Sequence, residues 1–148
     1  MDAQVNTSAA DTAQLSMQRI EPGAPYQSPG PMLIAWKRRR VLEHMDANLG
    51  GPLRNRELAA LVDLSEFHFN VAFRNSVGAT PHEFLIRRRI ERAQRLMLST
   101  DMPLCDIAAE CGLADQAHLS RLFRKVVGET PAAWRRSRFS LAYTGDIA

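Results

Sequence analysis

The fold is decided by residues 107–131, which read IAAECGLADQAHLSRLFRKVVGETP. Residues 58–81 read LAALVDLSEFHFNVAFRNSVGATP and follow the same pattern. The apolar triplets at 58–60 and 107–109 correspond at an offset of 49 residues, and the stretches 73–81 and 123–131 correspond at an offset of 50. The second copy therefore has one residue more than the first, and it lies in the turn between the two helices of that copy. The sequence therefore predicts two similar subdomains rather than a solenoid.

Each copy has the layout of a helix-turn-helix, in which a short helix, a tight turn and a second helix follow one another. Three kinds of residue are expected to hold each unit together: small residues where the helices meet, a leucine that plugs the turn, and a phenylalanine that anchors the second helix. These are Ala59, Ala60, Ala108 and Ala109, then Leu64 and Leu113, then Phe73 and Phe123. A plain helical bundle with an inherited duplication is the alternative.

From residue 33 onward the apolar periodicity is helical, and no stretch is typical of a strand. We expect helices over about 33–48, from a cap at Asn55 through Leu61, over about 66–77 and about 81–98, from Pro103 to Cys111, from Asp115 to just before Gly128, and from Thr130 through Trp134. Thr80 and Glu83 form a capping-box sequence around Pro81. The predicted fold class is all-α: seven helices forming two homeodomain-like helix-turn-helix subdomains joined by a long linker helix.

The chain divides into three parts. Residues 1–31 are rich in Pro and Gly near their end and lack apolar periodicity, so we expect a disordered tail. Residues 32–140 are the predicted domain, with a first unit at about 33–80, the linker helix at about 81–98 and a second unit at about 101–138. Residues 141–148 are a predicted C-terminal tail. The linker helix would be about 27 Å long, and successive major grooves on one face of DNA lie about 34 Å apart. One chain could therefore reach two adjacent grooves.

Composition limits the functional classes. The chain has 148 residues, of which 45% are hydrophobic and 24% charged, as expected of one globular domain. Its net charge is +3, and its only lysines are Lys37 and Lys125. The other basic side chains are Arg, which suits phosphates and guanine edges. A membrane span, a secretory signal, a disulfide framework, a four-ligand zinc site and a large cofactor-binding enzyme are not expected. Cys105 and Cys111 are expected to be buried free thiols in a reducing cytosol.

Several motifs resemble the AraC/XylS family of bacterial transcription regulators. In the second copy they are the stretches 107–113, 118–125 and 128–131, followed by Trp134-Arg135; in the linker they are residues 89–96. The resemblance covers about residues 35–138. It implies a DNA-binding domain that controls transcription, similar to the short, single-domain members, without an effector domain or a cofactor. Two departures are Leu113, where the family usually has an aromatic, and Val71, where a basic or polar residue is frequent.

The second helix of the second unit holds the principal candidates for DNA contact. Gln116, Ala117, Ser120 and Arg121 lie on the face expected to meet bases, because residues four apart are one helical turn apart. Gln pairs with adenine, Arg with guanine, and an alanine methyl contacts thymine. Arg124 and Lys125 are expected at phosphate. His118 either contacts phosphate or supports the turn.

The second helix of the first unit offers fewer polar groups. Phe67, Asn70 and Val71 are expected at bases, with Asn70 as the best hydrogen-bonding candidate, and Arg74 at phosphate. We therefore expect less sequence discrimination from this unit.

The remaining charged residues, and the residue types that can bind metals, do not indicate a further functional site. The basic runs 37–40 and 87–89 spread around their helices, so each member is expected to be solvated surface. Trp134 is expected to anchor the last helix in the core. No metal site, activated nucleophile or enzymatic activity is predicted.

The expected partners are double-stranded DNA and RNA polymerase, in the cytoplasm at the bacterial nucleoid. The alternative is an interaction module that acts on RNA polymerase or another regulator without reading DNA. A third possibility, an alkylation-repair protein, lacks its cysteine-rich metal site.

Overall fold

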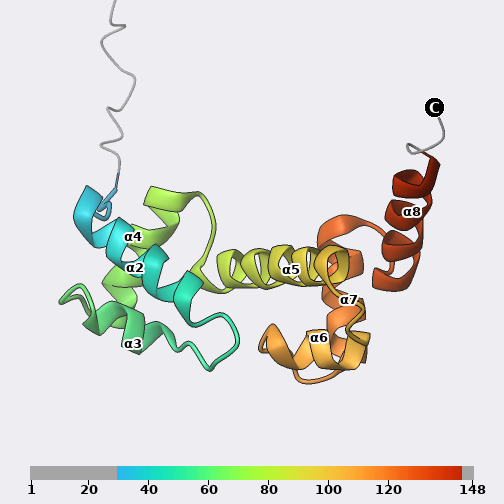
Figure 1. The fold of residues 1–148 in the computed structure, drawn as a ribbon. Coiled ribbons are helices and arrows are strands. Elements are labelled where there is room, and N and C mark those ends of the chain that lie inside the picture. Colours follow the sequence, from blue (N-terminus) through green and yellow to red (C-terminus); the bar gives the residue numbers. More distant parts are fainter. Residues whose placement is uncertain (1–29, 145–148) are drawn as a thin grey trace, which may run out of the picture.

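The computed structural model describes residues 30–144, and side chains through residue 141. The tail predicted at 1–31 therefore lies almost entirely outside the described residues, as do residues 145–148. Within 30–144 the chain forms seven helices and no strand, which confirms the predicted fold class (Figure 1). The helices are α2 (Ala35–Ala47), α3 (Asn55–Ala60), α4 (Glu66–Val77), α5 (Pro81–Ser99), α6 (Leu104–Glu110), α7 (Gln116–Val127) and α8 (Pro131–Thr144).

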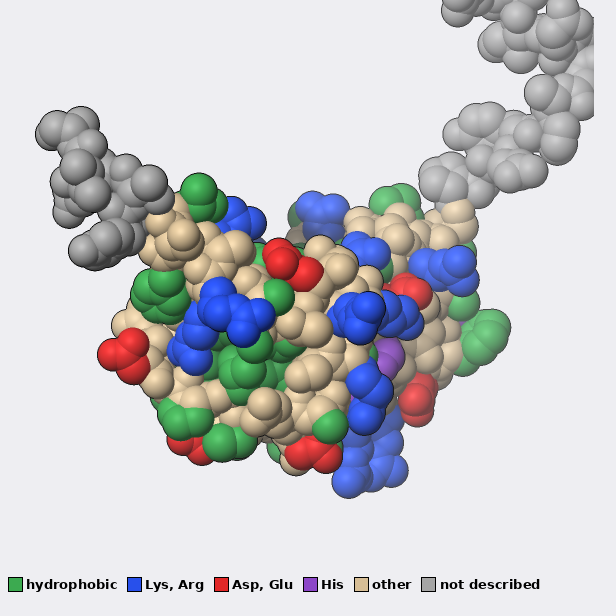
Figure 2. All heavy atoms as spheres, turned by 90° about the vertical axis from the view of Figure 1, so that its right-hand side faces the viewer, with side chains coloured by type: hydrophobic (Ala, Val, Ile, Leu, Met, Phe, Trp, Pro, Cys, Tyr) green, Lys and Arg blue, Asp and Glu red, His purple; other side chains and the backbone are tan. Residues whose placement is uncertain are grey.

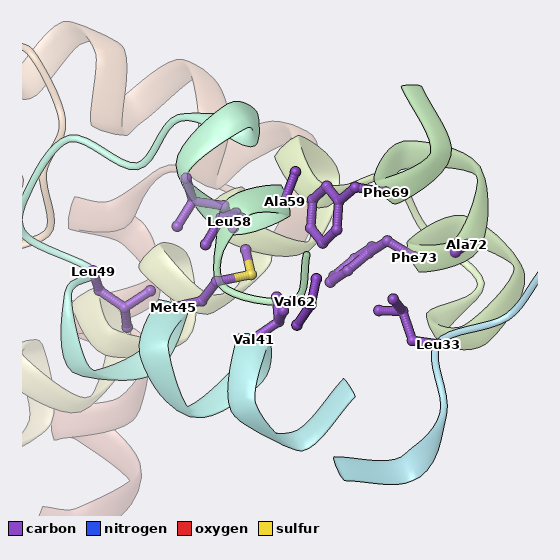
Figure 3. Packing of buried hydrophobic residues seen from close by; sticks show 11 residues of the cluster. Leu33, Val41, Met45, Leu49, Leu58, Ala59, Val62, Phe69, Ala72 and Phe73 are labelled. Atoms are coloured by element: carbon purple, nitrogen blue, oxygen red, sulfur yellow. The ribbon is translucent and has the colours of Figure 1, made fainter. Parts of the chain in front are cut away.

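Two separate apolar cores correspond to the two sequence copies. The first core lies among α2, α3 and α4, and Figure 3 shows Phe69 and Phe73 of α4 pointing toward Val62 and the α2 residues Val41 and Met45. The second core is formed by α5, α6, α7 and α8 around Leu119 and Phe123. Burial of large apolar side chains is the main stabilising contribution in both units.

The helix α5 belongs to both cores, although unequally. Leu85 packs in the first core, whereas the predicted stripe of Ile86, Ile90, Ala93 and Met97 is buried in the second. Figure 1 shows α5 running from the first unit into the second. With 19 residues the helix is about 28 Å long. Its role is therefore that of a shared core helix rather than a bare spacer.

The start of α5 is fixed by the predicted capping box. The Thr80 hydroxyl accepts from the Glu83 backbone N–H at 3.2 Å, and the Thr80 backbone N–H donates to the Glu83 carboxylate at 2.9 Å. The Thr80 backbone N–H and then the Thr80 hydroxyl, which donates to the same carboxylate at 3.0 Å, hold the pKa of Glu83 below its ordinary value of 4.5. The stabilisation from this carboxylate is therefore present above pH 4.5 and is lost as the pH falls through the lowered pKa.

Three expected helix ends differ from the structure. The first helix begins at Ala35, and Ile34, expected on its apolar face, is exposed. Asn55 does not cap α3: it is the first helical residue, and its side chain hydrogen-bonds to Asn70 instead. The last helix continues past Trp134 to Thr144, so the expected tail at 141–148 begins inside α8. Beyond Trp134 this helix exposes Phe139 and Leu141, so its outer turns lack the buried stripe that predicts a helix from sequence.

Most of the predicted packing residues are buried. Phe73, Phe123, Leu113, Ala59 and Ala108 are in the cores, and Leu64 packs against the first core while half-buried. Ala60 and Ala109, by contrast, are exposed, so the prediction that they lie between the helices was wrong. Only the first alanine of each pair, Ala59 in the first unit and Ala108 in the second, is buried.

The two tryptophans offer a matched test of the second core. Trp134 is 5% exposed and packs edge-to-face on Phe123 with ring centroids 5.7 Å apart, whereas Trp36 on α2 is 52% exposed. Trp134→Ala is expected to lower the free energy of unfolding by about 3–5 kcal/mol, because it removes a buried aromatic. Trp36→Ala is expected to lower it by less than about 1 kcal/mol. Urea unfolding followed by circular dichroism measures both, and equal losses would contradict the assignment of Trp134 as a core anchor.

Candidate nucleic-acid interface

The turn between the two helices of each unit has the same hydrogen bonds in both copies. The N–H of Leu64 donates to the Ala59 carbonyl at 3.1 Å, and the N–H of Leu113 donates to the Ala108 carbonyl at 2.9 Å. The residue before each leucine has a positive φ, 55° at Asp63 and 71° at Gly112. This is the Schellman arrangement, which ends a helix and turns the chain sharply. The extra residue of the second copy, Ala114, follows this arrangement.

Each second helix then starts on a side-chain cap. Ser65 accepts from the backbone N–H of His68 at 3.2 Å, and Asp115 accepts from the backbone N–H of His118 at 2.7 Å. A carboxylate at this position also interacts favourably with the helix dipole. Both helices end at a glycine in the left-handed region, Gly78 and Gly128. The sequence thus fixes the beginning, the end and the entry angle of both candidate recognition helices.

The α7 helix exposes polar side chains in its first turn and on the side away from its buried residues. Gln116, Ala117 and Arg121 are exposed, and Ser120 is half-buried. Leu119 and Phe123 are fully buried on the other side. Within the described part of the chain, neither Gln116 nor Arg121 has a side-chain hydrogen bond or an ion pair. Their donors and acceptors are therefore free to meet a ligand.

The two basic residues expected at phosphate follow on the same helix. Arg124 and Lys125 are exposed and lie in the last turn of α7, where positive charge is favourable for the helix dipole. Neither side chain is paired with a carboxylate among residues 30–141. The face that α7 leaves to solvent therefore carries three unpaired positive charges.

His118 supports the turn. Its Nδ1 accepts the backbone N–H of Ala114 at 3.3 Å, and the ring is half-buried. An accepting Nδ1 places the proton of the neutral ring on Nε2. In the first unit His68 makes a different contact, since its Nδ1 lies 2.6 Å from the Ser65 hydroxyl. The shared histidine position thus stabilises both turns through different partners.

The α4 helix presents a more apolar face. Phe67 is 73% exposed and packs edge-to-face on His68 with centroids 5.6 Å apart. Val71 is half-buried, and Arg74 is exposed. The side-chain Oδ1 of Asn70 accepts a hydrogen bond from the side-chain Nδ2 of Asn55 at 3.1 Å. This contact orients the Asn70 side-chain amide and leaves its Nδ2 hydrogens for another partner. Asn55 is therefore a supporting residue that the sequence analysis did not identify.

Two shallow hollows meet at the first turn of α5. One is lined by Asn70, Val71 and Arg74 of α4 together with Thr80, Pro81 and His82. The other has a volume of about 310 Å³ and lies between α5 and α7, where His82, Arg87 and Lys125 contribute its basic side chains. His82 lines both hollows. The exposed face of α4 and the C-terminal half of α7 thus border the same turn of α5.

Sequence reasoning missed His82 and Arg87 as members of this surface. In the sequence His82 lies within the capping-box stretch 80–83, and Arg87 is one member of the basic run 87–89. The available signal was their position in the first two turns of the helix that joins the units. Figure 2 shows the molecule from the end where α8 lies, and on this face several Lys and Arg side chains gather beside a histidine.

The basic runs are not uniformly solvated, which corrects the expectation for three of their members. The Lys37 ammonium donates to the Val62 carbonyl at 2.6 Å. Arg88 is paired with Asp46, which raises the pKa of Arg88. Arg89 is half-buried and donates to two backbone carbonyls, and burial lowers its pKa. These three side chains are committed to contacts within the protein, so they are poor candidates for phosphate.

The structure places the two thiols in different environments. Cys111 is buried, as expected, and burial raises the pKa of its thiol. Cys105 is exposed, so the expectation of two buried thiols was wrong for this residue. In the described part of the chain no three His, Cys, Asp or Glu side chains are grouped to hold a metal ion. No described helix is long and apolar enough to span a membrane.

Known proteins share this arrangement. Residues 58–137 match a family described as a helix-turn-helix domain. The MmsAB operon regulatory protein of Pseudomonas aeruginosa is 34% identical over 93 residues, which are 63% of this chain and 30% of that protein. The bifunctional transcriptional activator and DNA repair enzyme AdaA of Bacillus subtilis is 29% identical over 107 residues, 72% of this chain and 51% of that protein. The chain thus spans a third to a half of these relatives.

Solved structures have the same fold. A transcriptional regulator from Chromobacterium violaceum with an AraC-type DNA-binding domain superposes with a TM-score of 0.65 at 26% identity, covering 69% of this chain and 91% of that chain. The DNA-binding domain of AdpA, solved in complex with a target DNA, superposes with a TM-score of 0.65 at 30% identity, covering 68% and 91%. Two capped helix-turn-helix units, the shared helix and these matches together show that the chain belongs to the AraC/XylS family of helix-turn-helix DNA-binding domains.

Proposed function

We propose that this chain is a sequence-specific DNA-binding regulator of transcription that places α4 and α7 in adjacent major grooves of one duplex. The observation that carries the proposal is the outer face of α7, where Gln116 and Arg121 are exposed and have no side-chain partner among residues 30–141. The similarity to a domain that was solved on its target DNA supports it. The function places the chain in the bacterial cytoplasm, where chromosomal DNA is accessible.

On α7 each exposed side chain has a distinct role. Arg121 donates two hydrogen bonds to the O6 and N7 atoms of guanine, which is the commonest specific contact in the major groove. Gln116 pairs with the N6 and N7 atoms of adenine. Ala117 contributes a methyl contact to thymine, and Ser120 hydrogen-bonds at a base edge. Together they read several base pairs of one half-site.

On α4 the contacts are mainly apolar. Phe67 and Val71 contact thymine methyl groups, and Asn70, oriented by Asn55, is the principal hydrogen-bonding residue. Apolar contacts distinguish bases less sharply than paired hydrogen bonds do. The first unit therefore contributes affinity more than sequence discrimination.

Phosphate contacts position the two helices. Arg74 on α4, together with Arg124 and Lys125 on α7, lies at the borders of the reading faces. The hollows at His82 and Arg87 lie between these residues, along the path that a DNA backbone takes between two grooves. We assign His82 and Arg87 to this backbone segment. His118 contacts phosphate through Nε2 while its Nδ1 remains on Ala114.

A second candidate function is an interaction module that acts on RNA polymerase or another regulator. One observation favours it: Phe67 is 73% exposed on α4. A large exposed aromatic side chain suits a protein partner as well as it suits a DNA base. Contact with RNA polymerase is also compatible with DNA binding. A gel-shift assay with varied salt separates the two functions, because an interaction module would show no preference for any duplex. We do not assign the repair activity named for AdaA, since Cys105 on α6 is exposed whereas Cys111, which follows α6, is buried.

The experiment that tests the proposal directly is in vitro selection of bound duplexes, followed by titration of an Arg121→Ala variant. The variant is expected to lose about 1–3 kcal/mol of binding free energy on the selected site and to relax the preference at one base pair. Arg95→Ala is the matched control, because Arg95 is an exposed arginine on α5 without a side-chain partner among the described residues. Unchanged affinity for Arg121→Ala would remove this residue from the interface.

The unequal roles of the two units predict an asymmetric site. Single base-pair substitutions in the half bound by α7 are expected to cost about 1–3 kcal/mol each. Substitutions in the half bound by α4 are expected to cost less than about 1 kcal/mol, because their contacts are chiefly apolar. Competition titrations over a complete set of single substitutions measure this. Equal losses in both halves would contradict the assignment of α4 as the weaker reader.

Phosphate contacts predict a specific dependence on salt. Each phosphate neutralised by the protein contributes about −0.9 to the slope of log K against log salt concentration. Lys125→Ala is expected to reduce the magnitude of this slope by about 1 and to weaken binding to all sequences alike. The Arg95→Ala control is expected to keep the wild-type slope. A Lys125→Ala variant that loses affinity for the selected site alone would place Lys125 at a base instead.

A further inference from the structure

The loop that follows α2 lies in backbone contact with the turn of the second unit. The side chain of Leu49 is buried in the first core, yet its carbonyl oxygen would lie 2.6 Å from a Cβ at Gly112. Conversely, a Cβ at Gly50 would lie 2.9 Å from the carbonyl oxygen of Glu110. Real Cβ atoms essentially never come this close to a backbone oxygen. Each unit therefore presents a glycine to a carbonyl group of the other.

Arg89 of α5 holds this loop from the side. Its Nε donates to the Leu49 carbonyl at 2.9 Å, and its Nη2 donates to the Gly51 carbonyl at 2.8 Å. The guanidinium is half-buried and has no carboxylate partner among the described residues. A planar fork can satisfy two carbonyls at once, which an ammonium cannot do in the same geometry. Arg89 thus satisfies two backbone acceptors of the loop that follows α2.

Two ion pairs flank the same contact. Arg88 donates to both carboxylate oxygens of Asp46 at 2.7 and 2.9 Å, which joins α5 to the last turns of α2. Arg92 pairs with Glu110 at the end of α6, with a distance of 3.5 Å. We call this set of contacts the inter-unit clamp. Its members are Asp46, Leu49, Gly50, Gly51, Arg88, Arg89, Arg92, Glu110 and Gly112.

The clamp provides a second attachment between the units. The first is the start of α5, where Leu85 lies in the first core. A single attachment near one end of a helix permits rotation about that point. A second attachment, one to two turns further along α5 and reaching α6, opposes such rotation. The relative position of α4 and α7 is therefore fixed by two contacts of different chemistry.

We propose that the inter-unit clamp sets the distance and rotation between the two recognition helices, and thereby selects one spacing between the two half-sites in DNA. Arg89 acts as a positioning residue: it does not touch DNA. Inserting one base pair moves a half-site by about 3.4 Å and rotates it by about 34° around the duplex axis. A clamped protein cannot follow this change with both helices, whereas an unclamped protein can. The proposal rests on the proposed function.

Two variants open the clamp in independent ways. Gly50→Ala inserts a methyl group against the Glu110 carbonyl, at a residue whose φ lies outside the left-handed region. Arg89→Met keeps the aliphatic stem and removes both hydrogen bonds to the loop. The matched controls are Gly51→Ala and Arg95→Met, the latter on the exposed side of the same helix. Gly51→Ala is a control because Gly51 contributes only its backbone carbonyl to the clamp, which alanine keeps, and because its Cβ would meet its nearest atom at an ordinary 3.7 Å. Arg89→Lys replaces Arg89→Met if the latter does not fold.

The first readout is affinity for duplexes in which one base pair is inserted between, or removed from between, the selected half-sites. Wild type and both controls are expected to bind the altered spacings at least about tenfold more weakly than the selected spacing. Gly50→Ala and Arg89→Met are expected to reduce this difference to less than about threefold. A variant that is merely less stable would lose affinity for all spacings in the same proportion. An unchanged spacing preference in both variants would overturn the clamp and leave the proposed function intact.

The second readout needs no DNA. Residual dipolar couplings of backbone N–H groups report whether two units tumble as one body. One alignment tensor is expected to fit both units of the wild-type chain, and tensors of different magnitude are expected for Gly50→Ala. If in vitro selection enriches no duplex, the proposed function fails, but the dipolar couplings still test whether the clamp holds the two units rigidly together. A single shared tensor in both clamp variants would show that α5 alone fixes the units, and the inference would be wrong.

Discussion

Burial of one phenylalanine from each second helix is the constraint on which the candidate interface depends. Phe73 of α4 and Phe123 of α7 are fully buried, and each helix is therefore unable to rotate about its axis without exposing a large aromatic surface. Successive residues of a helix are about 100° apart, so Arg121 and Lys125 lie about 200° from Phe123. The core thus determines which side chains face outward. The exposure of the candidate base-reading side chains Ala117 and Arg121 on α7 is a consequence of packing on its opposite side.

The repeat made much of this predictable from sequence. Two copies with the same spacing revealed the turns, the caps and the anchoring phenylalanines, because these features depend on neighbours within a few residues. For the same reason α4 was predicted with its observed bounds, and α7 begins one residue after the predicted start at Asp115, which is its N-cap. The predicted exposure of Arg121 follows from periodicity alone. Its contact with a base, like that of every other candidate, remains a prediction.

The inter-unit clamp was not predictable, and the physical reason is that its partners are backbone atoms. Arg89 donates to carbonyl groups, which every residue carries, so no residue pattern marks the acceptors. The sequence Gly50-Gly51 is typical of a helix stop, and nothing in it indicates that Gly50 also faces the second unit. Arg88 and Arg89 looked like members of a solvated basic run. Contacts between residues about 40 positions apart depend on the assembled fold, which local periodicity does not describe.

In the proposed complex, the rigidity of the clamp explains how the first unit adds to DNA affinity although α4 distinguishes bases poorly. The face of α4 offers apolar Phe67 and Val71, with Asn70 as its main hydrogen-bonding group, so α4 alone would discriminate poorly among sequences. Once α7 is seated, a rigidly held α4 is presented to the adjacent groove at a high effective concentration, and even modest contacts then add to the affinity. A loosely tethered α4 would lose part of that gain to the entropy of ordering. Arg89 and the paired glycines therefore influence DNA recognition through the placement of α4, without any contact with a base.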